Sequence, residues 1–580
     1  MNEASNVLLF VTINTHLRVL MDVADLLKSS GRYTPIFVYY PSAVFDCNYN
    51  NCQSAPYESY IWTSEHLYSE GSFEPAADYF SSRCSHSTPF SQMTTDKVGH
   101  ENGKVDNFFR WLSSPTDLAK KTKALLIMVA QVVQLVIYAY TFLRVALFSI
   151  IPPLNFPALQ QREQNALKKK TRFQRFLLHF YAYRWAEISK RRQRVNVNRL
   201  QLLIEKFEDD VLYGLKEQQV FYEQISYFIQ QQIPALIILP EDNFFFRGNF
   251  IVRAAHLNAV PVAIVPFTIV NTLEWAEAFF NVSAYQADRG WNRLFAKAFP
   301  HWVLEHRGRQ LIFPAIYVLG SEYFGMTPDV PWLISSGHTD ALAAESQFMV
   351  DYYIRAGIRR DKIRLTGALS DDTLFFHLSE RDRQCKKLGA RCGIEMKDKI
   401  VLIALPPDQF TTENWKNDEF DCYDTLILFL VGVVTELSGN NFTVLINLHP
   451  RITLEKVACL ANCGATIVME PIERLVPLAD LYVAVTSATI RLAISCGVPV
   501  VNYDAYQYNY DDFKGLSGVC EVRSKQEYRA ILNSLLNDPQ FYSRVHEAQK
   551  ASENNFCHLD GKAGERMLAL FDDLVSAYLQ

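Results

Sequence analysis

Apolar residues form two short continuous runs at the start of the chain, and an amphipathic segment separates them. The runs at 6–13 and 33–40 have the length of buried strands, while residues 16–31 place apolar side chains at helical spacing and end on a glycine. Continuous apolar strands that alternate with helices are typical of a parallel sheet covered on both faces. The pattern therefore predicts a strand–helix–strand unit of an α/β fold.

The same alternation resumes after residue 232. We predict a strand at 235–240 with an acidic exit, then a helix and a strand within 250–267, and a further strand at 315–323. A polar and basic stretch at about 375–398 is expected to link this half of the chain to the next. Residues 1–375 are thus expected to form an N-terminal domain.

The second half of the chain alternates more regularly. Helices are predicted at 422–438 and 488–496 and in a C-terminal pair, and strands in the apolar runs at 400–408, 442–450, 465–470, 481–487 and 498–504. The predicted fold class is α/β, with two Rossmann-like domains, 1–375 and 398–580, that face each other across a cleft. In such sheets ligands bind at the carboxyl ends of the strands.

A long insertion, residues 41–230, interrupts the N-terminal domain. Within it, residues 124–143 carry no charge over a length that suffices to span a bilayer, although four polar side chains recur there at helical spacing. A basic stretch follows, with eleven lysines and arginines against one glutamate between Lys168 and Arg199. The segment 117–200 therefore predicts hydrophobic and basic helices that associate with a membrane.

The order of the strands limits how this segment can meet a membrane. If strands 6–13 and 235–240 belong to one sheet, they lie on the same side of the bilayer, so a single crossing at 124–143 is excluded. We expect a monotopic or re-entrant attachment, with the basic residues on anionic headgroups at the inner face of the cytoplasmic membrane. A buried core helix followed by a solvated basic helix is the alternative.

Composition excludes several other classes of protein. The chain of 580 residues has a net charge of −5, which gives no support for nucleic acid as a partner. Its eleven cysteines are scattered and odd in number, a pattern that fits reduced thiols in the cytoplasm better than a disulfide framework. The first residues carry no basic segment before the first strand, so no signal peptide is expected.

Candidate chemistry begins where the strand at 442–448 ends, on His449, Pro450 and Arg451. Proline stops the strand ladder, so the imidazole and the guanidinium stand at the carboxyl end of the sheet. A cationic pair in that place suits a phosphate or pyrophosphate. A polar strand end without function explains the same tripeptide.

A second candidate lies where the strand at 481–485 runs into Ser487 and Thr489, which open the next helix. Hydroxyls and unpaired backbone N–H groups at a helix start favour an anion. Serine in this position is also a common helix cap. Because this strand and the one that ends at His449 belong to one predicted sheet, we expect both groups at the same sheet edge.

Acidic residues supply the candidates for proton transfer. Glu241 and Asp242 follow the strand at 235–240, where a carboxylate can deprotonate an acceptor hydroxyl. An acidic turn or helix cap is the alternative there. His16 follows the first strand in a similar place, and Asp504 ends a strand of the second domain where a sugar or ribose hydroxyl could bind. No motif for a metal site is present, so no metal or other cofactor is expected.

Together these motifs resemble the bacterial GT-B glycosyltransferases that act on surface polysaccharides: sialyltransferase-like, Kdo-transferase-like and CDP-glycerol-transferase-like enzymes. Their shared marks correspond here to His449–Pro450, to Ser487 with Thr489, and to Glu241–Asp242. The family's acidic motif commonly ends in glycine, whereas this chain has Asn243. The UDP-N-acetylglucosamine 2-epimerases share the architecture and an element similar to the one that begins at Thr366–Gly367.

The resemblance implies a role for each of these residues. His449, Arg451, Ser487 and Thr489 would bind the donor phosphate, with His449 assisting the leaving group. Glu241 or Asp242 would deprotonate the acceptor, and His16, Thr366, Gly367 and Asp504 are weaker candidates for donor or acceptor binding. Such fixed donors neutralise phosphate charge without a metal.

The implied function is transfer of a sugar from a nucleotide-activated donor to a surface glycan or glycolipid acceptor. Two other functions fit the same sequence. One is a sugar-nucleotide enzyme like the UDP-N-acetylglucosamine 2-epimerases, and the other is a non-catalytic scaffold of the same fold in polysaccharide assembly.

Overall fold

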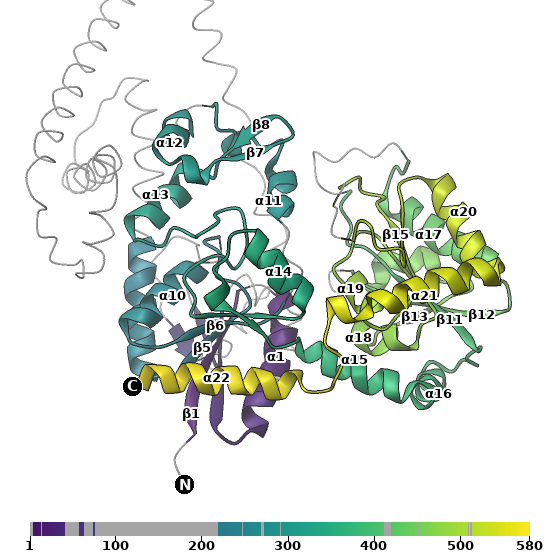
Figure 1. Ribbon diagram of the computed structural model, residues 1–580, viewed down its shortest axis with the longest axis horizontal. Helices are drawn as coiled ribbons and strands as arrows, with labels where there is room; N and C mark the ends of the chain where they lie inside the picture. The colour runs from purple at the N-terminus through teal and green to yellow at the C-terminus, as the bar shows by residue number, and fades with distance from the viewer. Residues whose placement is uncertain are drawn as a thin grey trace, which may run out of the picture. The chain divides into compact units, whose positions relative to one another are not determined.

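The computed structural model describes two mainly parallel sheets with helices packed against them (Figure 1). The described residues are 4–12, 14–40, 57–62, 73–75 and 218–579, the last range with gaps at 246, 268–271, 290–291, 411–418, 450–451, 509 and 511–512.

The first sheet is built outward from its first strand. Strand β1 (Ser5–Val11) pairs in parallel with β2 (Tyr33–Tyr39) on one side and with β5 (Leu236–Leu239) on the other. Helix α1 (Asn14–Ser29) connects β1 to β2, as the sequence predicts. The pairing of β1 with β5 confirms that the two predicted strands, far apart in the chain, belong to one sheet.

The strand order of this sheet is β10-β9-β6-β5-β1-β2-β3-β4. The remaining strands are β3 (Glu58–Trp62), β4 (Phe73–Pro75), β6 (Val262–Ile264), β9 (Ala341–Ala344) and β10 (Ile363–Leu365). Helix α10 (Gly248–Leu257) leads into β6, and α14 (Gln347–Arg355) with the 3-10 turn η3 (Arg360–Lys362) leads into β10. The chain moves from β1 to β2 in one direction and from β5 to β6 in the other, so β1 and β5 flank the point where the strand order reverses.

The second sheet repeats this plan, with the order β13-β12-β11-β14-β15-β16. Its strands are β11 (Lys399–Ala404), β12 (Phe442–Asn447), β13 (Thr466–Val468), β14 (Leu481–Ala484), β15 (Val500–Tyr503) and β16 (Val519–Val522), all parallel. Here the order reverses between β11 and β14. Two Rossmann-like sheets are therefore present, in agreement with the predicted fold class.

The helices of the second sheet follow the predicted alternation. They are α17 (Tyr423–Ser438), η4 (Leu454–Leu460), α18 (Ile472–Leu475), η5 (Val476–Leu478), α19 (Ile490–Ser495), α20 (Lys525–Asn537) and α21 (Pro539–Phe556). Helix α19 has six residues and is shorter than the predicted helix at 488–496.

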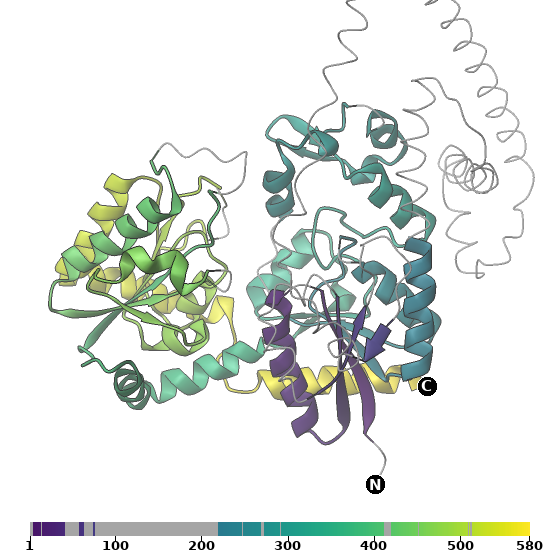
Figure 2. The same cartoon turned by 180° about the vertical axis from the view of Figure 1, so that it is seen from behind.

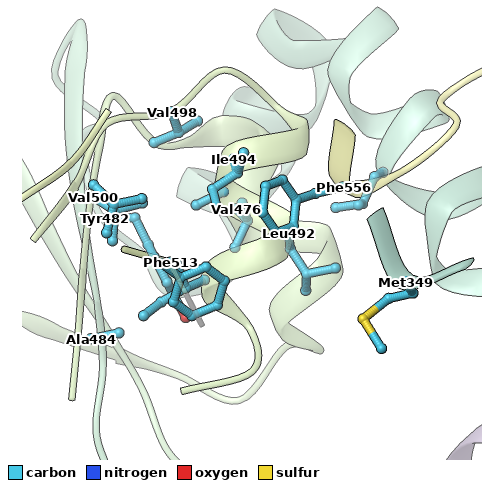
Figure 3. Packing of buried hydrophobic residues seen from close by; sticks show 14 of the residues in the cluster. Met349, Val476, Tyr482, Ala484, Leu492, Ile494, Val498, Val500, Phe513 and Phe556 are labelled. Carbon is cyan, nitrogen blue, oxygen red and sulfur yellow. The ribbon is translucent and has the colours of Figure 1, made fainter. Parts of the chain in front are cut away.

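The apolar runs of the second sheet are buried on both faces. Along β14, Leu481 and Val483 pack into one hydrophobic cluster, while Tyr482 and Ala484 pack into another. Figure 3 shows Tyr482 and Ala484 in the latter cluster, with Val500 of the neighbouring strand. Side chains of a strand alternate between the two faces, so a strand with helices on both sides has no polar position to show in its sequence.

One predicted strand is wrong. Residues 315–323 form a helix, α13 (Ala315–Tyr323), because the buried side chains Ala315, Val318 and Leu319 recur at helical spacing. A run of nine mostly apolar residues does not distinguish a strand from a buried helix by composition alone. The other elements between β6 and β9 are α11 (Thr272–Phe279), η1 (Ser283–Tyr285), α12 (Asn292–Ala298), η2 (Pro300–Trp302) and the hairpin β7 (Leu304–His306) and β8 (Arg309–Leu311).

The predicted linker at 375–398 coincides largely with two helices, α15 (Leu369–Ser379) and α16 (Arg381–Cys392). The last helix, α22 (Ala563–Leu579), returns to the first sheet, where Figures 1 and 2 both show it beside α1 and β5. Asp572 of this helix accepts a hydrogen bond from the Tyr33 hydroxyl at 2.6 Å, and the Tyr578 hydroxyl donates to Asp340 at 2.7 Å. The end of the chain thus belongs to the first sheet's packing.

The segment expected to associate with a membrane, 117–200, lies outside the described residues. Within the part of the chain that the structure describes, no helix combines the length and apolar character that crossing a bilayer requires.

Candidate functional site

The strands that flank the reversal point of the first sheet, β1 and β5, both end in candidate residues. His16 follows β1 in the first turn of α1, and Glu241 follows β5. Their side chains meet, with 3.1 Å between His16 Nε2 and Glu241 Oε1. Two residues that the sequence predicts as separate candidates therefore form one pair, at the place in the sheet where ligands of this fold class bind.

Neighbouring side chains fix this imidazole–carboxylate pair from several sides. Thr12 Oγ1 lies 3.0 Å from His16 Nδ1, and the Asn243 amide donates to Glu241 Oε2 at 2.6 Å. The ring of Phe267 packs against the imidazole in an edge-to-face arrangement, with 4.6 Å between the two ring centroids. His16 is fully buried, and Glu241 retains 8% exposure. Both carboxylate oxygens of Glu241 therefore face a protein partner, and the carboxylate is held in one orientation.

Asp242, the other predicted carboxylate, points into the protein. Its Oδ1 accepts the backbone N–H of Gly337 at 3.2 Å, and Lys362, which also contacts the Gly337 carbonyl, lies near enough to stabilise its charge. Burial raises the pKa of the Asp242 carboxyl, and Lys362 opposes that shift.

Two glycines leave room for Asp242 in this position. A Cβ on Gly337 would lie 2.4 Å from Asp242 Oδ2, and one on Gly248 would lie 2.8 Å from its Cα. The close packing indicates that Asp242 holds the loop after β5 in place. Of the two acidic residues, Glu241 is the less buried, with 8% exposure against 2% for Asp242.

At the reversal point of the second sheet, the backbone leaves β14 through a strained residue. Thr486 has a φ of 42°, in the left-handed region that β-branched residues rarely adopt. Its N–H donates to Asn502 Oδ1 at 3.0 Å, and its hydroxyl donates to Asp504 Oδ1 at 3.3 Å. Both partners belong to β15 or its exit, so the neighbouring strand maintains the strained turn.

Ser487 and Thr489 follow this turn and contact each other. The two hydroxyl oxygens are 2.7 Å apart, and Thr489 Oγ1 is also 2.6 Å from the Tyr482 hydroxyl. The Thr489 N–H donates to Ser487 Oγ at 3.3 Å. Ser487 and Thr489 are both partly exposed. The predicted hydroxyl pair is thus present, and Tyr482 joins it from the buried face of β14.

His449 follows β12 and is partly exposed, and its carbonyl accepts the N–H of Ile452 at 2.8 Å. Pro450 and Arg451 lie outside the described residues. Strands β12 and β14 run in the same direction and are separated by β11 alone. His449 and Ser487, which follow these strands, therefore lie at the same edge of the sheet. Asp504, another candidate on this sheet, follows β15, and its Oδ1 accepts hydrogen bonds from the Thr486 hydroxyl and the Tyr508 N–H, so it helps to fix the turn.

Thr366 and Gly367 participate in the packing of the C-terminal helix. The Thr366 carbonyl accepts the Arg566 guanidinium at 2.7 Å, and a Cβ on Gly367, whose φ is 80°, would lie 3.0 Å from Ala563. Asp372 accepts the first N–H groups of α22, from Ala563 and Gly564, both at 2.9 Å. These contacts give the element a structural role whether or not it also meets a ligand.

A buried ionic group that was not predicted from the sequence involves the helix that follows Thr489. Arg491 of α19 donates to Asp371 Oδ1 at 3.2 Å and to the Ser370 hydroxyl at 3.3 Å, and its side chain is 13% exposed. Glu345, which follows β9, is buried nearby. Burial raises the pKa of the Glu345 carboxyl, and Arg491 opposes that shift. The signal in the sequence is that Arg491 is the only charged residue of the predicted helix at 488–496.

Among the described residues, no group of three histidine, cysteine or acidic side chains gathers in a way that could hold a metal ion. The expectation that no metal or other cofactor takes part stays a prediction.

Comparison with known proteins adds a set of distant structural similarities. No family model and no curated protein matches the sequence. The wall teichoic acid polymerase TagF matches at 14% identity with a TM-score of 0.32, over 42% of this chain and 58% of that chain. The calicheamicin glycosyltransferase CalG4 matches at 11% identity and a TM-score of 0.44, over 100% and 99% of the two chains.

A UDP-GlcNAc 2-epimerase from Neisseria meningitidis matches at 15% identity and a TM-score of 0.37, over 62% of this chain and 82% of that chain. The TagF match spans less than two thirds of that polymerase. At these identities and scores the similarities carry no argument about activity. The fold assignment rests on the order and direction of the strands in the two sheets.

Proposed function

We propose that the chain is a glycosyltransferase that moves a sugar from a nucleotide-activated donor to a hydroxyl group of a glycan or glycolipid acceptor. The observation that carries this proposal is the Glu241–His16 pair at the reversal point of the first sheet. Burying an imidazole and a carboxylate together costs folding free energy, and such buried titratable pairs are common at functional sites. The chemistry of this pair suits proton transfer.

In the proposed reaction, Glu241 accepts the proton of the acceptor hydroxyl. The acceptor oxygen then forms a bond to the sugar carbon, while the bond from that carbon to the donor phosphate oxygen breaks and the phosphate keeps the electron pair. His16 holds Glu241 through the 3.1 Å contact, and Thr12 fixes the orientation of the ring. His16 is a positioning residue in this scheme, since both of its ring nitrogens face protein groups.

On the second sheet, Ser487 is proposed to donate a hydrogen bond to the donor phosphate. Resemblance to the bacterial enzymes supports a similar role for His449 and for Arg451, which lies outside the described residues. Such donors stabilise the charge that develops on the leaving phosphate. Helix α19, with six residues, is too short to contribute much through its dipole, so the hydroxyl and the cationic side chains carry the proposed site.

The test of this function begins with ligand binding. Uridine, cytidine and guanosine diphosphates and cytidine monophosphate are added at millimolar concentration, and the midpoint of thermal unfolding is followed. We expect one of them to raise the midpoint, because a ligand that binds the folded state alone stabilises it. If none does, the donor site is wrong.

Turnover is then followed as nucleotide release from sugar conjugates of the base that binds. Release that depends on an added glycan or glycolipid acceptor supports transfer. Release at full rate with no acceptor supports a sugar-nucleotide enzyme of the 2-epimerase kind instead, and binding without turnover supports a scaffold.

Membrane association is a separate proposal. It rests on the sequence of 117–200 and on the confirmed pairing of β1 with β5, which requires both ends of the insertion to be on one side of a bilayer. We propose that the segment attaches the protein, peripherally or monotopically, to the inner face of the cytoplasmic membrane. Deleting residues 120–200 should move the protein from the membrane fraction to the soluble fraction, and unchanged sedimentation would contradict the proposal.

A further inference from the structure

Three hydroxyl groups form a chain that runs from the interior of the second sheet to the proposed phosphate site. The Tyr482 hydroxyl lies 2.6 Å from Thr489 Oγ1, which lies 2.7 Å from Ser487 Oγ. Tyr482 is fully buried, packed among Val500, Ala484 and their neighbours (Figure 3), whereas Ser487 is partly exposed. Each hydroxyl has one proton to donate, so the chain has a direction.

Burial of Tyr482 decides that direction. Burial also raises the pKa of its hydroxyl, so the group stays protonated at neutral pH. Within the described residues, Thr489 is the one hydrogen-bond partner of this hydroxyl. If Thr489 donated to Tyr482, the tyrosine proton would be buried without an acceptor, which is strongly disfavoured. Tyr482 therefore donates to Thr489.

The rest of the chain follows from this first bond. Thr489 Oγ1 accepts from Tyr482 and directs its own proton to Ser487 Oγ, which also accepts the Thr489 N–H at 3.3 Å. Because its oxygen already accepts two hydrogen bonds, the Ser487 hydroxyl can donate its own proton to a group other than these three hydroxyls. The third hydroxyl of this segment, on Thr486, is bonded to Asp504. Of the three side-chain hydroxyls between residues 486 and 489, the one on Ser487 is therefore the one available as a donor.

We infer that Tyr482 is a positioning residue that, through Thr489, keeps the Ser487 hydroxyl oriented as a donor, so that the site accepts an oxyanion such as a phosphate oxygen. This inference rests on the proposed function and changes one of its details. Thr489, which the sequence predicts as a direct phosphate ligand, acts through Ser487. A ligand hydroxyl that offers only its proton finds no acceptor at Ser487, because two donors already occupy that oxygen.

Removing the tyrosine hydroxyl tests the relay. In Tyr482→Phe, Thr489 Oγ1 loses its donor and becomes an acceptor that competes for the Ser487 proton. We expect the dissociation constant of inorganic pyrophosphate, measured by titration calorimetry on the full chain, to rise about three- to tenfold, the size of one hydrogen bond. Tyr528→Phe is the matched control, because Tyr528 is also fully buried and donates to the Leu430 carbonyl at 3.0 Å.

A double-mutant cycle separates the relay from direct contact by Thr489. Thr489→Val leaves Ser487 its proton and takes away the competing acceptor, so it should weaken pyrophosphate binding less than Tyr482→Phe does. The double variant Tyr482→Phe/Thr489→Val should bind about as well as Thr489→Val alone, and hence better than Tyr482→Phe. If Thr489 contacts the ligand, the double variant will instead bind most weakly of the three.

Two results would overturn the relay, and they differ from failure of the function. Unchanged pyrophosphate binding in Tyr482→Phe, or a double variant weaker than both single variants, contradicts the relay while the donor site stands. If the wild-type protein binds neither pyrophosphate nor any nucleoside diphosphate, the donor site and the relay are both wrong. Thermal unfolding of each variant shows that it is folded, and the comparison among folded variants is made on affinity alone.

Discussion

The two sheets of this protein place candidate chemistry at equivalent points but assemble it in different ways. At the first sheet, His16 and Glu241 come from strands far apart in the chain and meet as a buried pair. At the second sheet, Ser487 and Thr489 are two residues apart, and their hydroxyls meet directly after a turn that β15 and its exit hold in place. An imidazole and a carboxylate can be buried at little cost only where each has polar partners, whereas a cluster of hydroxyls can form within one segment.

The difference suggests a division of work. The first sheet offers a group that can accept a proton, and the second offers groups that donate hydrogen bonds to an anion. Four changes test this division, beginning with the one expected to have the largest effect.

Glu241→Gln should lower turnover by about 10²- to 10⁴-fold, the usual contribution of a general base. Nucleotide affinity should be unchanged, because Glu241 belongs to the first sheet and the proposed phosphate site to the second. Glu277→Gln is the matched control, since Glu277 also pairs with a histidine, His306, at 2.9 Å. Equal turnover in Glu241→Gln and Glu277→Gln would remove the catalytic role from the His16–Glu241 pair.

Arg491→Gln should reduce the free energy of unfolding by about 3–5 kcal/mol, because it leaves Asp371 and Glu345 buried without their cationic partner. Urea denaturation measures this change. Arg529→Gln, which breaks the exposed pair with Glu436, serves as the control and should leave stability nearly unchanged. A similar stability for both variants would mean that Arg491 does not hold α19 in place. The site around Ser487 would then depend on its own segment and not on this buried ion pair.

Ser487→Ala should weaken pyrophosphate binding by roughly 10- to 100-fold, the range for a hydrogen bond to a charged group. Ser534→Ala, which removes an exposed hydroxyl bonded to a helix carbonyl, is the control. Turnover at saturating donor should fall far less than in Glu241→Gln. If Ser487→Ala and Glu241→Gln affect binding and turnover alike, the two sheets do not divide the work.

Glu345→Gln should change how stability depends on pH. Burial raises the pKa of Glu345 in the folded protein above its ordinary value of about 4.3, so between the two values the folded state binds more protons than the unfolded state. The wild-type free energy of unfolding should therefore fall as pH rises through this window, and the variant should show a shallower fall. Denaturation at several pH values measures both slopes, and parallel slopes would show that Glu345 is not the group responsible. Glu305→Gln, on the surface, controls for the loss of a charge.

Much of the fold could be predicted because its strands are strongly apolar. The runs that became β1, β2, β5, β11, β12 and β14 were recognisable, since strands covered on both faces have few polar positions. The segment 315–323 was equally apolar and formed a helix, α13. Composition therefore identified what is buried more securely than it identified the secondary structure of a short run.

Some residues of the candidate site could be predicted from the sequence, and others could not. Ser487 and Thr489 could be found because their spacing on the chain already placed them together. The pairing of His16 with Glu241 could not, because it depends on β1 and β5 being neighbours in the sheet. Asp242 and Glu241 look alike in the sequence, yet one points toward Gly337 and Lys362 and the other toward His16.

By itself, the sequence determined that two α/β halves exist, where their apolar strands lie, and which polar side chains stand at the strand exits. Local spacing and side-chain chemistry are sufficient for that. The folded arrangement was needed to show which strand exits are neighbours, which carboxylate is buried in a loop, and which hydroxyl can donate its proton. Those properties depend on strand order, on burial and on the partners of each polar atom, and residues distant in the sequence supply all three.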